Sequence, residues 1–385
     1  MAFICELFFP YVKGGAENRY WEVSKRLARE HEIHVFTMRP KGTPAEETLE
    51  GVYVHRTNEF KDLYSQDGRR RIWPSVVFSW ELLKQILRDY GKFDVVDFSA
   101  FPYLPCLSAK ILSAHWRAPL AVTFHEVWGS YWFEYFRNSF SARVGKFFEC
   151  STVQLANKII AVSQWTALAL SEVYKVSQEK LTIIPNGVSL DFIRSVSKEK
   201  EQLKVLYVGR LIEHKHVDWL LTAMKIVLTS YPNASLHIIG DGPRRDSLES
   251  YARELGIASA VHFYGTLSNR LEVVEHMKSA SVFVLPSTRE GFSMVTLEAM
   301  AAGTPVVVVR APLNAALDYV KDGQNGLVVE SDKPDVIANA ITLLFEDSDL
   351  YLKLVRNGFS IVELYNWVTI TSMLEKFYLS LAESD

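Results

Sequence analysis

Short apolar runs alternate with longer amphipathic segments through the first half of the chain. The apolar runs are Ala2–Phe9, Ile33–Phe36, Val52–His55, Val95–Phe98, Leu120–Thr123 and Lys158–Val162. Runs of this length that are apolar on both faces are typical of strands buried inside a parallel sheet. The segments between them have helical periodicity, as in Ala16–Arg29, Val76–Asp89 and Pro105–Ala114. This alternation predicts an α/β domain with a doubly wound parallel sheet.

The same pattern resumes in the second half. Its apolar runs are Lys204–Val208, Ser235–Ile239, Val261–Tyr264, Ser281–Leu285, Val306–Val309 and Leu327–Val329. The intervening stretch Asp191–Gln202 is polar and charged, so it is interpreted as a linker. A length of 385 residues accommodates two domains. We expect Rossmann-like domains at 1–190 and 203–360 that face each other across a cleft, and a helix at 361–385 that packs back towards the first domain.

Composition narrows the class of protein. The three cysteines are far apart and odd in number, which indicates neither a disulfide framework nor metal-ligand spacing and favours a reducing compartment. Met1–Phe9 is interpreted as a strand rather than a signal peptide. No apolar run approaches the roughly 20 residues of a membrane span. With a net charge of −3 and neither half strongly basic, we expect a cytoplasmic protein that does not bind nucleic acid.

The segment Pro286–Pro305 contains two carboxylates at a suggestive spacing. Glu290 lies in a polar loop, and Glu298 lies within a helix that is predicted to begin near Ser293. Glu290 precedes the helix N-terminus, where free amides can bind an anion. This layout suits a ligand with hydroxyl groups at both ends and a phosphate between them. The alternative is an exposed Glu290 and a salt-bridged Glu298.

Glycines and cations follow the strands of the second half. Gly209, Arg210 and Lys215 come after its first strand, where the two cations could neutralise a diphosphate or could simply be solvated. Gly240 follows the next strand and gives a ligand room at the backbone. The stretch around it lacks the third glycine of the dinucleotide fingerprint, because Arg245 stands there. A nicotinamide enzyme is therefore disfavoured.

Two features of the first half also point to the carboxyl edge of its sheet. Gly14–Gly15 opens a helix after the first strand, and His125 directly follows the fifth strand. Each feature also has a purely structural interpretation. Gly14–Gly15 could simply turn the chain, and His125 could be a core histidine whose hydrogen bonds are satisfied there.

An aromatic cluster lies between Trp128 and Phe148. Tyr131, Trp132, Tyr135 and Phe136 are spaced for one helical face, with Arg137, Arg143 and Lys146 nearby. One interpretation is a helix packed into the core. The other is an apolar surface for a lipid-linked acceptor or a membrane interface.

Taken together, these motifs resemble the retaining nucleotide-sugar glycosyltransferases of glycosyltransferase family 4, which have the GT-B fold. The resemblance covers nearly the whole chain. Its most specific element is the pair Glu290 and Glu298, separated by seven residues. The weaker elements occur in the expected order: the Gly14–Gly15 loop, His125, Ala161–Ser163, Pro185–Val188, Val208–Arg210 with Lys215, and Gly240–Gly242.

The resemblance implies a role for each candidate residue. Arg210 and Lys215 would bind the donor diphosphate and stabilise charge on the leaving group. Glu290 would face the donor sugar, and Glu298 would bind the ribose hydroxyls. His125 would contact the transferring sugar. The remaining donor-binding positions are Gly15, Gly209, Gly240 and the backbone of Gly291, Phe292, Ser293, Met294 and Val295.

The chain departs from the family pattern at Glu126, where many members carry aspartate, so the role of that position stays open. The resemblance implies transfer of a hexose-type sugar from a nucleoside diphosphate sugar to a glycan or lipid-linked acceptor, without metal or cofactor. Contact with the cytoplasmic face of a membrane is a further hypothesis. UDP, GDP and ADP are all open as the donor nucleotide. A sugar-nucleotide 2-epimerase of the same fold and a non-catalytic nucleotide-sugar binding protein are the alternatives.

Overall fold

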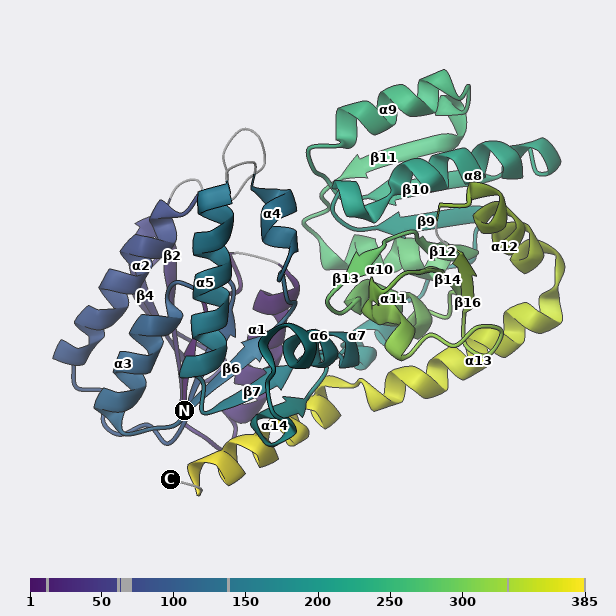
Figure 1. Ribbon diagram of the computed structural model, residues 1–385. Helices are drawn as coiled ribbons and strands as arrows, with labels where there is room; N and C mark the ends of the chain where they lie inside the picture. The colour runs from purple at the N-terminus through teal and green to yellow at the C-terminus, as the bar shows by residue number, and fades with distance from the viewer. Residues whose placement is uncertain (12–13, 61–62, 64–70, 137–138, 331, 384–385) are drawn as a thin grey trace. The chain divides into compact units, whose positions relative to one another are not determined.

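The computed structural model describes residues 1–11, 14–60, 63, 71–136, 139–330 and 332–383 (Figure 1). The chain forms two compact units. Unit 1 contains Met1–Asn186 together with the C-terminal segment from Trp367, and unit 2 contains Gly187–Asn366.

Unit 1 is built on an eight-stranded sheet with the strand order β3-β4-β2-β1-β5-β6-β7-β8. Its strands are β1 (Ala2–Ile4), β2 (Ile33–Pro40), β3 (Glu46–Leu49), β4 (Val52–Phe60), β5 (Val96–Ala100), β6 (Leu120–Phe124), β7 (Lys158–Ala161) and β8 (Leu181–Ile183). All neighbouring strands are parallel except β3 and β4. The predicted parallel sheet is confirmed.

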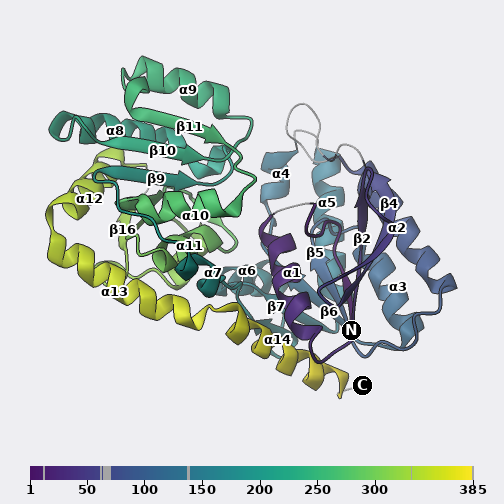
Figure 2. The same cartoon turned by 180° about the vertical axis from the view of Figure 1, so that it is seen from behind.

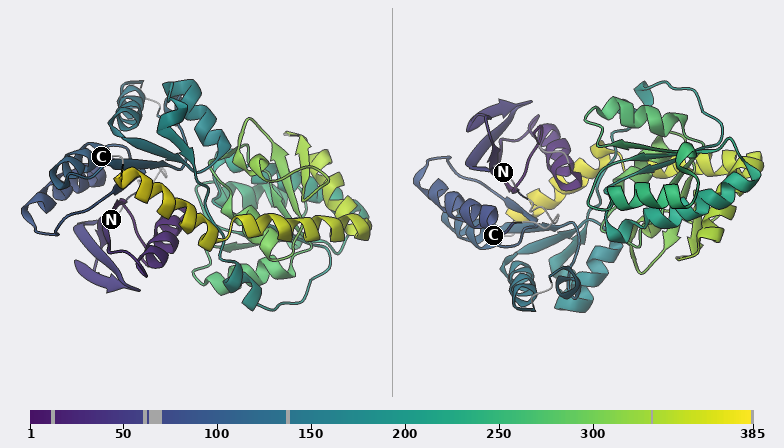
Figure 3. Two further views of the ribbon diagram at one scale, coloured as in Figure 1. Left: turned by 90° about the horizontal axis from the view of Figure 1, so that it is seen from below. Right: turned by 90° about the horizontal axis from the view of Figure 1, so that it is seen from above.

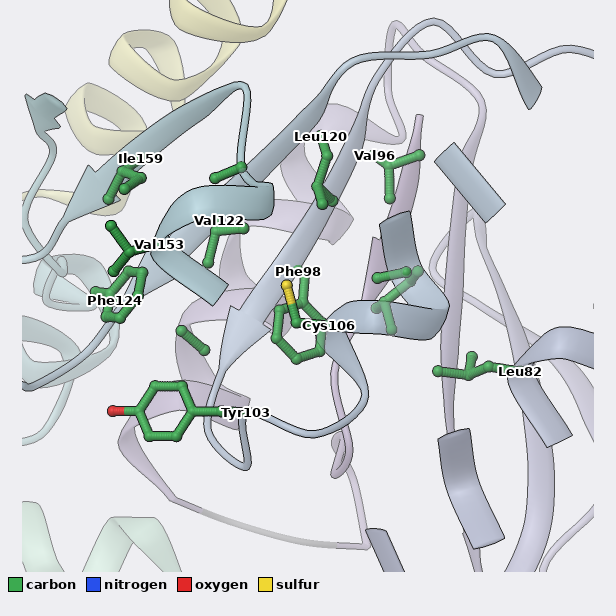
Figure 4. Packing of buried hydrophobic residues seen from close by; sticks show 14 of the residues in the cluster. Leu82, Val96, Phe98, Tyr103, Cys106, Leu120, Val122, Phe124, Val153 and Ile159 are labelled. Carbon is green, nitrogen blue, oxygen red and sulfur yellow. The ribbon is translucent and has the colours of Figure 1, made fainter. Parts of the chain in front are cut away.

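Helices cover both faces of this sheet. They are α1 (Gly15–Leu27), α2 (Trp73–Leu83), η1 (Lys84–Leu87), α3 (Cys106–Trp116), α4 (Tyr131–Tyr135), α5 (Ser139–Leu155), α6 (Gln164–Tyr174), η2 (Gln178–Lys180) and α14 (Trp367–Ala382). On one face, Phe98 of β5 and Val122 of β6 pack with Leu82 of α2 and Cys106 of α3 (Figure 4). On the other face, α1 and α14 lie side by side (Figure 2). Burial of apolar side chains on both faces explains why the strands have continuous apolar sequences.

Unit 2 contains a six-stranded parallel sheet with the order β11-β10-β9-β12-β14-β16. Its strands are β9 (Lys204–Val208), β10 (Ser235–Ile239), β11 (Val261–Gly265), β12 (Val282–Leu285), β14 (Val306–Arg310) and β16 (Leu327–Glu330). A separate pair is formed by β13 (Arg289–Glu290) and β15 (Leu313–Asn314). Two apolar clusters, one on each face, form the core. The second doubly wound domain is therefore also confirmed.

The helices of unit 2 are α7 (Leu190–Ser195), η3 (Glu213–Lys215), α8 (Val217–Ser230), α9 (Arg245–Glu254), η4 (Ala258–Ala260), α10 (Arg270–Ser279), α11 (Met294–Ala301), η5 (Ala315–Asp318), α12 (Pro334–Glu346) and α13 (Ser348–Leu364). Helix α8 packs against α12, and α13 packs against α11 (Figure 3). Within the described part of the chain, no helix is both long enough and apolar enough for a membrane span.

The structure differs from the sequence interpretation where the chain passes between the units. The predicted linker Asp191–Gln202 begins inside α7, because Leu190 and Ile193 are buried in the core of unit 2. The tail predicted as one helix at 361–385 consists of the end of α13 and then α14, with Tyr365 and Asn366 between them. Helix α14 belongs to unit 1.

Candidate functional site

Three glycine-containing loops meet at the carboxyl edge of the sheet in unit 2. The N–H of Gly209 donates to the carbonyl of Ile239 at 2.9 Å, and the N–H of Gly240 donates to the carbonyl of Gly265 at 2.8 Å. Gly240 has a φ of +134°, and a Cβ there would lie 1.9 Å from the carbonyl oxygen of Gly209. A side chain at position 240 would separate the loops. Ligands of open α/β sheets bind at this edge.

Lys215 and Glu290 form an ion pair beside these loops. The Nζ of Lys215 donates to Oε1 of Glu290 at 2.6 Å, and the two side chains are only 15% and 10% exposed. Glu290 is held by the pairing of β13 with β15, in which it lies opposite Asn314. Asn314 is buried and donates to the carbonyls of Ser287 and Val309. A charged pair held in this way contributes little net stability, because desolvation offsets the attraction.

Further cations surround His214, which precedes Lys215. Burial, followed by the charges of Lys215, Arg289 and Arg210, lowers the pKa of His214 to about 3. The backbone of Arg210 is fixed by the Tyr207 hydroxyl, which donates to its carbonyl at 3.0 Å, while the residue itself is exposed. His214 is therefore neutral near pH 7, and the charges of Lys215, Arg289 and Arg210 all act on this part of the edge.

Glu298 lies in α11 and pairs with a residue that the sequence motifs did not include. Its Oε1 is 3.2 Å from Nη2 of Arg270, at the beginning of α10. Burial raises the pKa of Glu298, and the charge of Arg270 opposes that shift. Of the two sequence interpretations, the salt-bridged Glu298 is what the structure contains, whereas Glu290 is not an exposed residue. The only sequence signal for Arg270 is its place after the helix-capping Asn269.

The start of α11 follows Glu290 closely. Gly291 and Phe292 lead into Ser293, and Met294 and Val295 form the first turn. Ser293 occupies the cap position as predicted, but its hydroxyl bonds to the hydroxyl of Thr296 at 2.8 Å instead of capping an amide. The first N–H groups of a helix have no intrahelical acceptor and favour an anion. This helix start can therefore serve a phosphate or sugar oxygens.

In unit 1, His125 directly follows β6 and is only partly buried. Its Nε2 lies 3.2 Å from Oγ of Ser99. Burial and the nearby charge of Arg19 lower the pKa of His125 to about 3, so the ring is neutral at physiological pH. Gly15 is the first residue of α1 and is exposed.

A buried network supports the edge that carries His125. Asp97 of β5 accepts hydrogen bonds from Tyr20 at 2.8 Å, from Thr123 at 3.0 Å and from Tyr378 of α14. Burial raises the pKa of Asp97, and hydrogen bonds from Tyr378 and Tyr20 oppose the shift. Arg19 is buried nearby and donates to the carbonyl of Pro185 at 2.7 Å. The sequence signal for this network was a carboxylate inside the apolar run Val95–Phe98.

The aromatic cluster divides between the two interpretations made from the sequence. Trp128 and Trp132 are buried in the core of unit 1, whereas Phe140 and Phe147 of α5 are exposed. The face predicted from Tyr131 to Phe136 corresponds to α4, which is only five residues long.

Known proteins resemble both halves of the chain. Residues 13–192 match the model described as Glycosyltransferase Family 4, and residues 190–360 match the model described as Glycosyl transferases group 1. The chain is a glycosyltransferase of the family 4 type. An uncharacterised glycosyltransferase of Methanocaldococcus jannaschii, MJ1178, is 27% identical to this glycosyltransferase over 98% of the chain and 97% of its own length. Alignments with two other curated relatives span 59% and 62% of the lengths of those relatives.

Solved structures share the fold of the glycosyltransferase. Sucrose-phosphate synthase from Thermosynechococcus elongatus has a TM-score of 0.82 at 20% identity, covering 100% of the chain and 99% of the synthase. Anabaena Alr3699/HepE in complex with UDP-glucose has a TM-score of 0.74 at 19% identity, covering 98% of the chain and 99% of HepE. Together with the two sheets, these similarities confirm the GT-B fold. The two family models confirm the enzyme class expected from the sequence.

Within unit 2, the structure brings Lys215 and Glu290 together, with Arg210 close to the same cationic cluster. Glu298 pairs with Arg270 in the same unit. The other expected donor-binding positions of this unit lie in the loop after β9, the loop after β10 and the start of α11. They are Gly209, Gly240, Gly291, Phe292, Ser293, Met294 and Val295. His125 and Gly15 belong to unit 1.

Proposed function

We propose that the protein transfers a hexose-type sugar from a nucleoside diphosphate sugar to the hydroxyl group of a glycan or lipid-linked acceptor. The observation that carries the proposal is the ion pair of Lys215 and Glu290 at the carboxyl edge of unit 2, with Arg210 and Arg289 close to His214. Such a cluster offers fixed positive charge to a diphosphate. The complex of HepE with UDP-glucose, which has the same fold, supports a nucleotide-sugar donor.

The roles of the side chains follow from their chemistry. Lys215 and Arg210 bind the diphosphate and stabilise the charge that develops on the leaving group. Glu290 accepts hydrogen bonds from the sugar hydroxyls, and its contact with Lys215 orients the ammonium group. Glu298 accepts from the ribose hydroxyls. The start of α11 binds sugar or phosphate oxygens through its amides.

Cations supplied by the protein allow the leaving group to depart without a metal ion. Breaking the bond between the sugar and the diphosphate leaves a positively charged, oxocarbenium-like sugar and an anionic nucleoside diphosphate. We propose retention of configuration by attack on the same face, with the leaving phosphate accepting the proton of the acceptor hydroxyl. Because His125 is neutral, it can donate or accept a hydrogen bond to the sugar without repelling the positive charge.

Unit 1 is proposed to bind the acceptor. Its exposed apolar side chains include Trp73 and Trp80 of α2 and Phe140 and Phe147 of α5. Aromatic side chains of this kind favour the interface between water and lipid. Peripheral contact with a membrane is therefore part of the proposal.

A ligand screen tests the donor assignment. UDP-, GDP- and ADP-sugars are added to the purified protein, and the melting temperature is measured. A donor present at about 100 times its Kd stabilises the folded state by about 2.7 kcal/mol. We expect one nucleotide class to raise the Tm of the wild type and of Lys225→Ala, an exposed lysine of α8, but not of Lys215→Ala.

A turnover assay with the stabilising donor then separates the reactions open to this fold. Transfer predicts release of the nucleoside diphosphate together with a labelled sugar attached to an added acceptor. Conversion of the donor into its isomer without an acceptor would overturn the proposed transfer and indicate an epimerase. Binding without any turnover would indicate a nucleotide-sugar binding protein.

A further inference from the structure

A cavity in unit 1 lies beside the carboxyl ends of β5 and β6. Its volume is about 230 Å³. Phe101 and Tyr103 line it from the segment after β5, and Trp128 lines it from the segment after β6. Trp132 of α4 and Phe148 of α5 complete the aromatic wall, and these two helices pack side by side in unit 1 (Figure 1). The lining is therefore built from several elements around one apolar space.

The cavity extends from the core of unit 1 to its surface. Trp128 and Trp132 are buried, whereas Ile72 and Phe140 line the same cavity and are 58% and 71% exposed. Arg71 is also exposed and is the only charged residue in the lining among the described residues. An apolar space open to solvent, with large apolar side chains at its exposed end, indicates a binding site for an apolar ligand.

A buried carboxylate fixes the aromatic wall in place. Glu149 is fully buried, and its oxygens accept from the backbone N–H of Trp128 at 2.7 Å and from the indole N–H of Trp132 at 2.8 Å. The hydroxyls of Tyr103 and Tyr174 donate to the same carboxylate at 2.9 and 2.5 Å. The carboxylate therefore orients all four of these hydrogen-bond donors. The cavity therefore exists before a ligand binds, which lowers the entropy lost on binding.

Helix α5 is shaped around the same wall. A Cβ at Gly145 would lie 2.4 Å from the ring of Trp132, so the glycine lets the helix backbone approach the indole. The rings of Phe101 and Trp128 stack with centroids 5.0 Å apart, and those of Trp132 and Phe136 stack at 5.8 Å. The wall is a rigid, stacked aromatic surface.

The cavity adjoins the segment that carries His125. Trp128 is three residues after His125, and its indole N–H donates to Oε1 of Glu126 at 2.6 Å. A ligand in the cavity therefore lies next to the edge of the unit 1 sheet that carries His125. The lining is almost entirely apolar, which suits a hydrocarbon chain better than a sugar, since sugar hydroxyls would lose their hydrogen bonds to water there.

We propose that this cavity binds the hydrocarbon chain of a lipid-linked acceptor. That the bound lipid is an acceptor rests on the proposed transfer function. Binding of the hydrocarbon chain itself does not depend on the donor. It selects the lipid-linked class over a free glycan.

The test uses neutral alkyl glucosides, so that attraction to surface cations plays no part. Hexyl, heptyl, octyl and nonyl β-D-glucoside are titrated below their micelle concentrations by calorimetry, with methyl β-D-glucoside as the head-group control. Burial of one methylene contributes about 0.8 kcal/mol, which is about a fourfold change in Kd. We expect Kd to fall about fourfold per added carbon until the cavity is full, and no binding of the methyl glucoside.

Substitutions that fill the cavity provide a second test of the proposal. Ser141 and Val144 of α5 line it, so Ser141→Phe and Val144→Phe should each weaken octyl glucoside binding by about tenfold or more. The control is Gln154→Phe on the same helix, because Gln154 is exposed and outside the lining. Its affinity should equal that of the wild type. Tm and near-UV circular dichroism verify that each variant is folded.

The outcomes distinguish this inference from the proposed function. Kd values that do not depend on chain length, or that are unchanged in both filled variants, would overturn the hydrocarbon site and leave donor binding by unit 2 unaffected. Binding of lipid vesicles without binding of monomeric alkyl glucosides would also overturn it, since it would indicate a membrane-facing surface. Chain-length-dependent binding in a protein that binds no nucleotide sugar would support the cavity and refute the transfer function.

Discussion

The ion pair between Lys215 and Glu290 allows a structural role to be separated from a role in donor chemistry. The two charges lie 2.6 Å apart and both side chains are largely buried. Lys215→Met removes the charge and keeps the unbranched stem, and Glu290→Gln keeps the shape of its side chain. We predict that Lys215→Met alone destabilises the protein more than the double variant does, because the single variant leaves the carboxylate without its cation.

The magnitude follows from the separation of the charges. At 2.6 Å, two unit charges attract by about 6 kcal/mol at an effective dielectric constant of about 20. Desolvation offsets most of this attraction, and coupling energies of contacting residues are about 0.5–3 kcal/mol. We therefore expect the double variant to be about 2 kcal/mol more stable than Lys215→Met, because it no longer contains a buried carboxylate without its cation. For a unit the size of Gly187–Asn366, that corresponds to a difference of about 4–8 °C in Tm.

Activity should behave differently from stability. A fixed group that stabilises developing negative charge contributes about 10²–10³ in rate. Lys215→Met should therefore lose about that factor in kcat/KM for the donor. The double variant should remain equally inactive although its stability is partly restored. The exposed Lys225 of α8 supplies the matched control, and Lys225→Met should retain both activity and Tm.

Scanning calorimetry and release of the nucleoside diphosphate measure the two quantities on the same four proteins, the wild type, both single variants and the double variant. Equal losses of Tm in Lys215→Met and in the double variant would refute the energetic argument. Restored turnover in the double variant would refute the assignment of Lys215 to the diphosphate. The two parts of the reasoning can therefore fail independently.

Three further substitutions test the supporting structure. Gly240→Ala should lower Tm and abolish the rise in Tm that the donor causes, because the new Cβ would lie 1.9 Å from a carbonyl oxygen. Gly358→Ala is the control and should be tolerated, because its Cβ would make an ordinary contact of 3.5 Å. Asp97→Ala should cost about 3 kcal/mol in urea unfolding, because it leaves three hydroxyl donors without their acceptor, and the exposed Asp94→Ala should cost little. The pKa of His214 is lowered to about 3 from 6.5, so the unfolded chain takes up a proton first as pH falls from 6.5 towards 3. Stability should decline over that range, and His214→Asn should flatten the decline; an unchanged pH dependence would contradict this cause.

Fully buried strands were predictable because their sequence is continuous in apolar residues. Val306–Val309 predicts β14, and all four residues are buried. Strand β3, with the sequence Glu-Glu-Thr-Leu, was missed because its residues alternate between exposed and partly buried at an edge of the sheet. The two-residue strands β13 and β15 were missed because only their pairing with each other defines them.

The candidate site was predictable where a motif fixed the spacing, and not where partners come from distant segments. The sequence predicted Glu290 and Glu298, and one of its alternatives included a salt bridge at Glu298, but it could not identify the cationic partner of either residue. Lys215 precedes Glu290 by 75 residues, and Arg270 precedes Glu298 by 28. The role of Glu149 was not predicted for the same reason. Its hydrogen-bond donors include residues as far apart in the sequence as Tyr103 and Tyr174. Contacts of this kind depend on which strands are neighbours, and strand order is not a property of any local pattern.

The two units use the same position of the same architecture for different chemistry. In unit 2, the segments after β9 and β10 are short and begin with Gly209 and Gly240, so backbone amides and cations lie at the sheet edge. In unit 1, the segment after β6 is long enough to contain α4 and is rich in aromatic residues, so it encloses an apolar cavity. Since the sheets position both edges alike, the loops determine which ligand each edge binds. Exchanging residues within a loop should therefore change donor or acceptor choice while both cores stay intact.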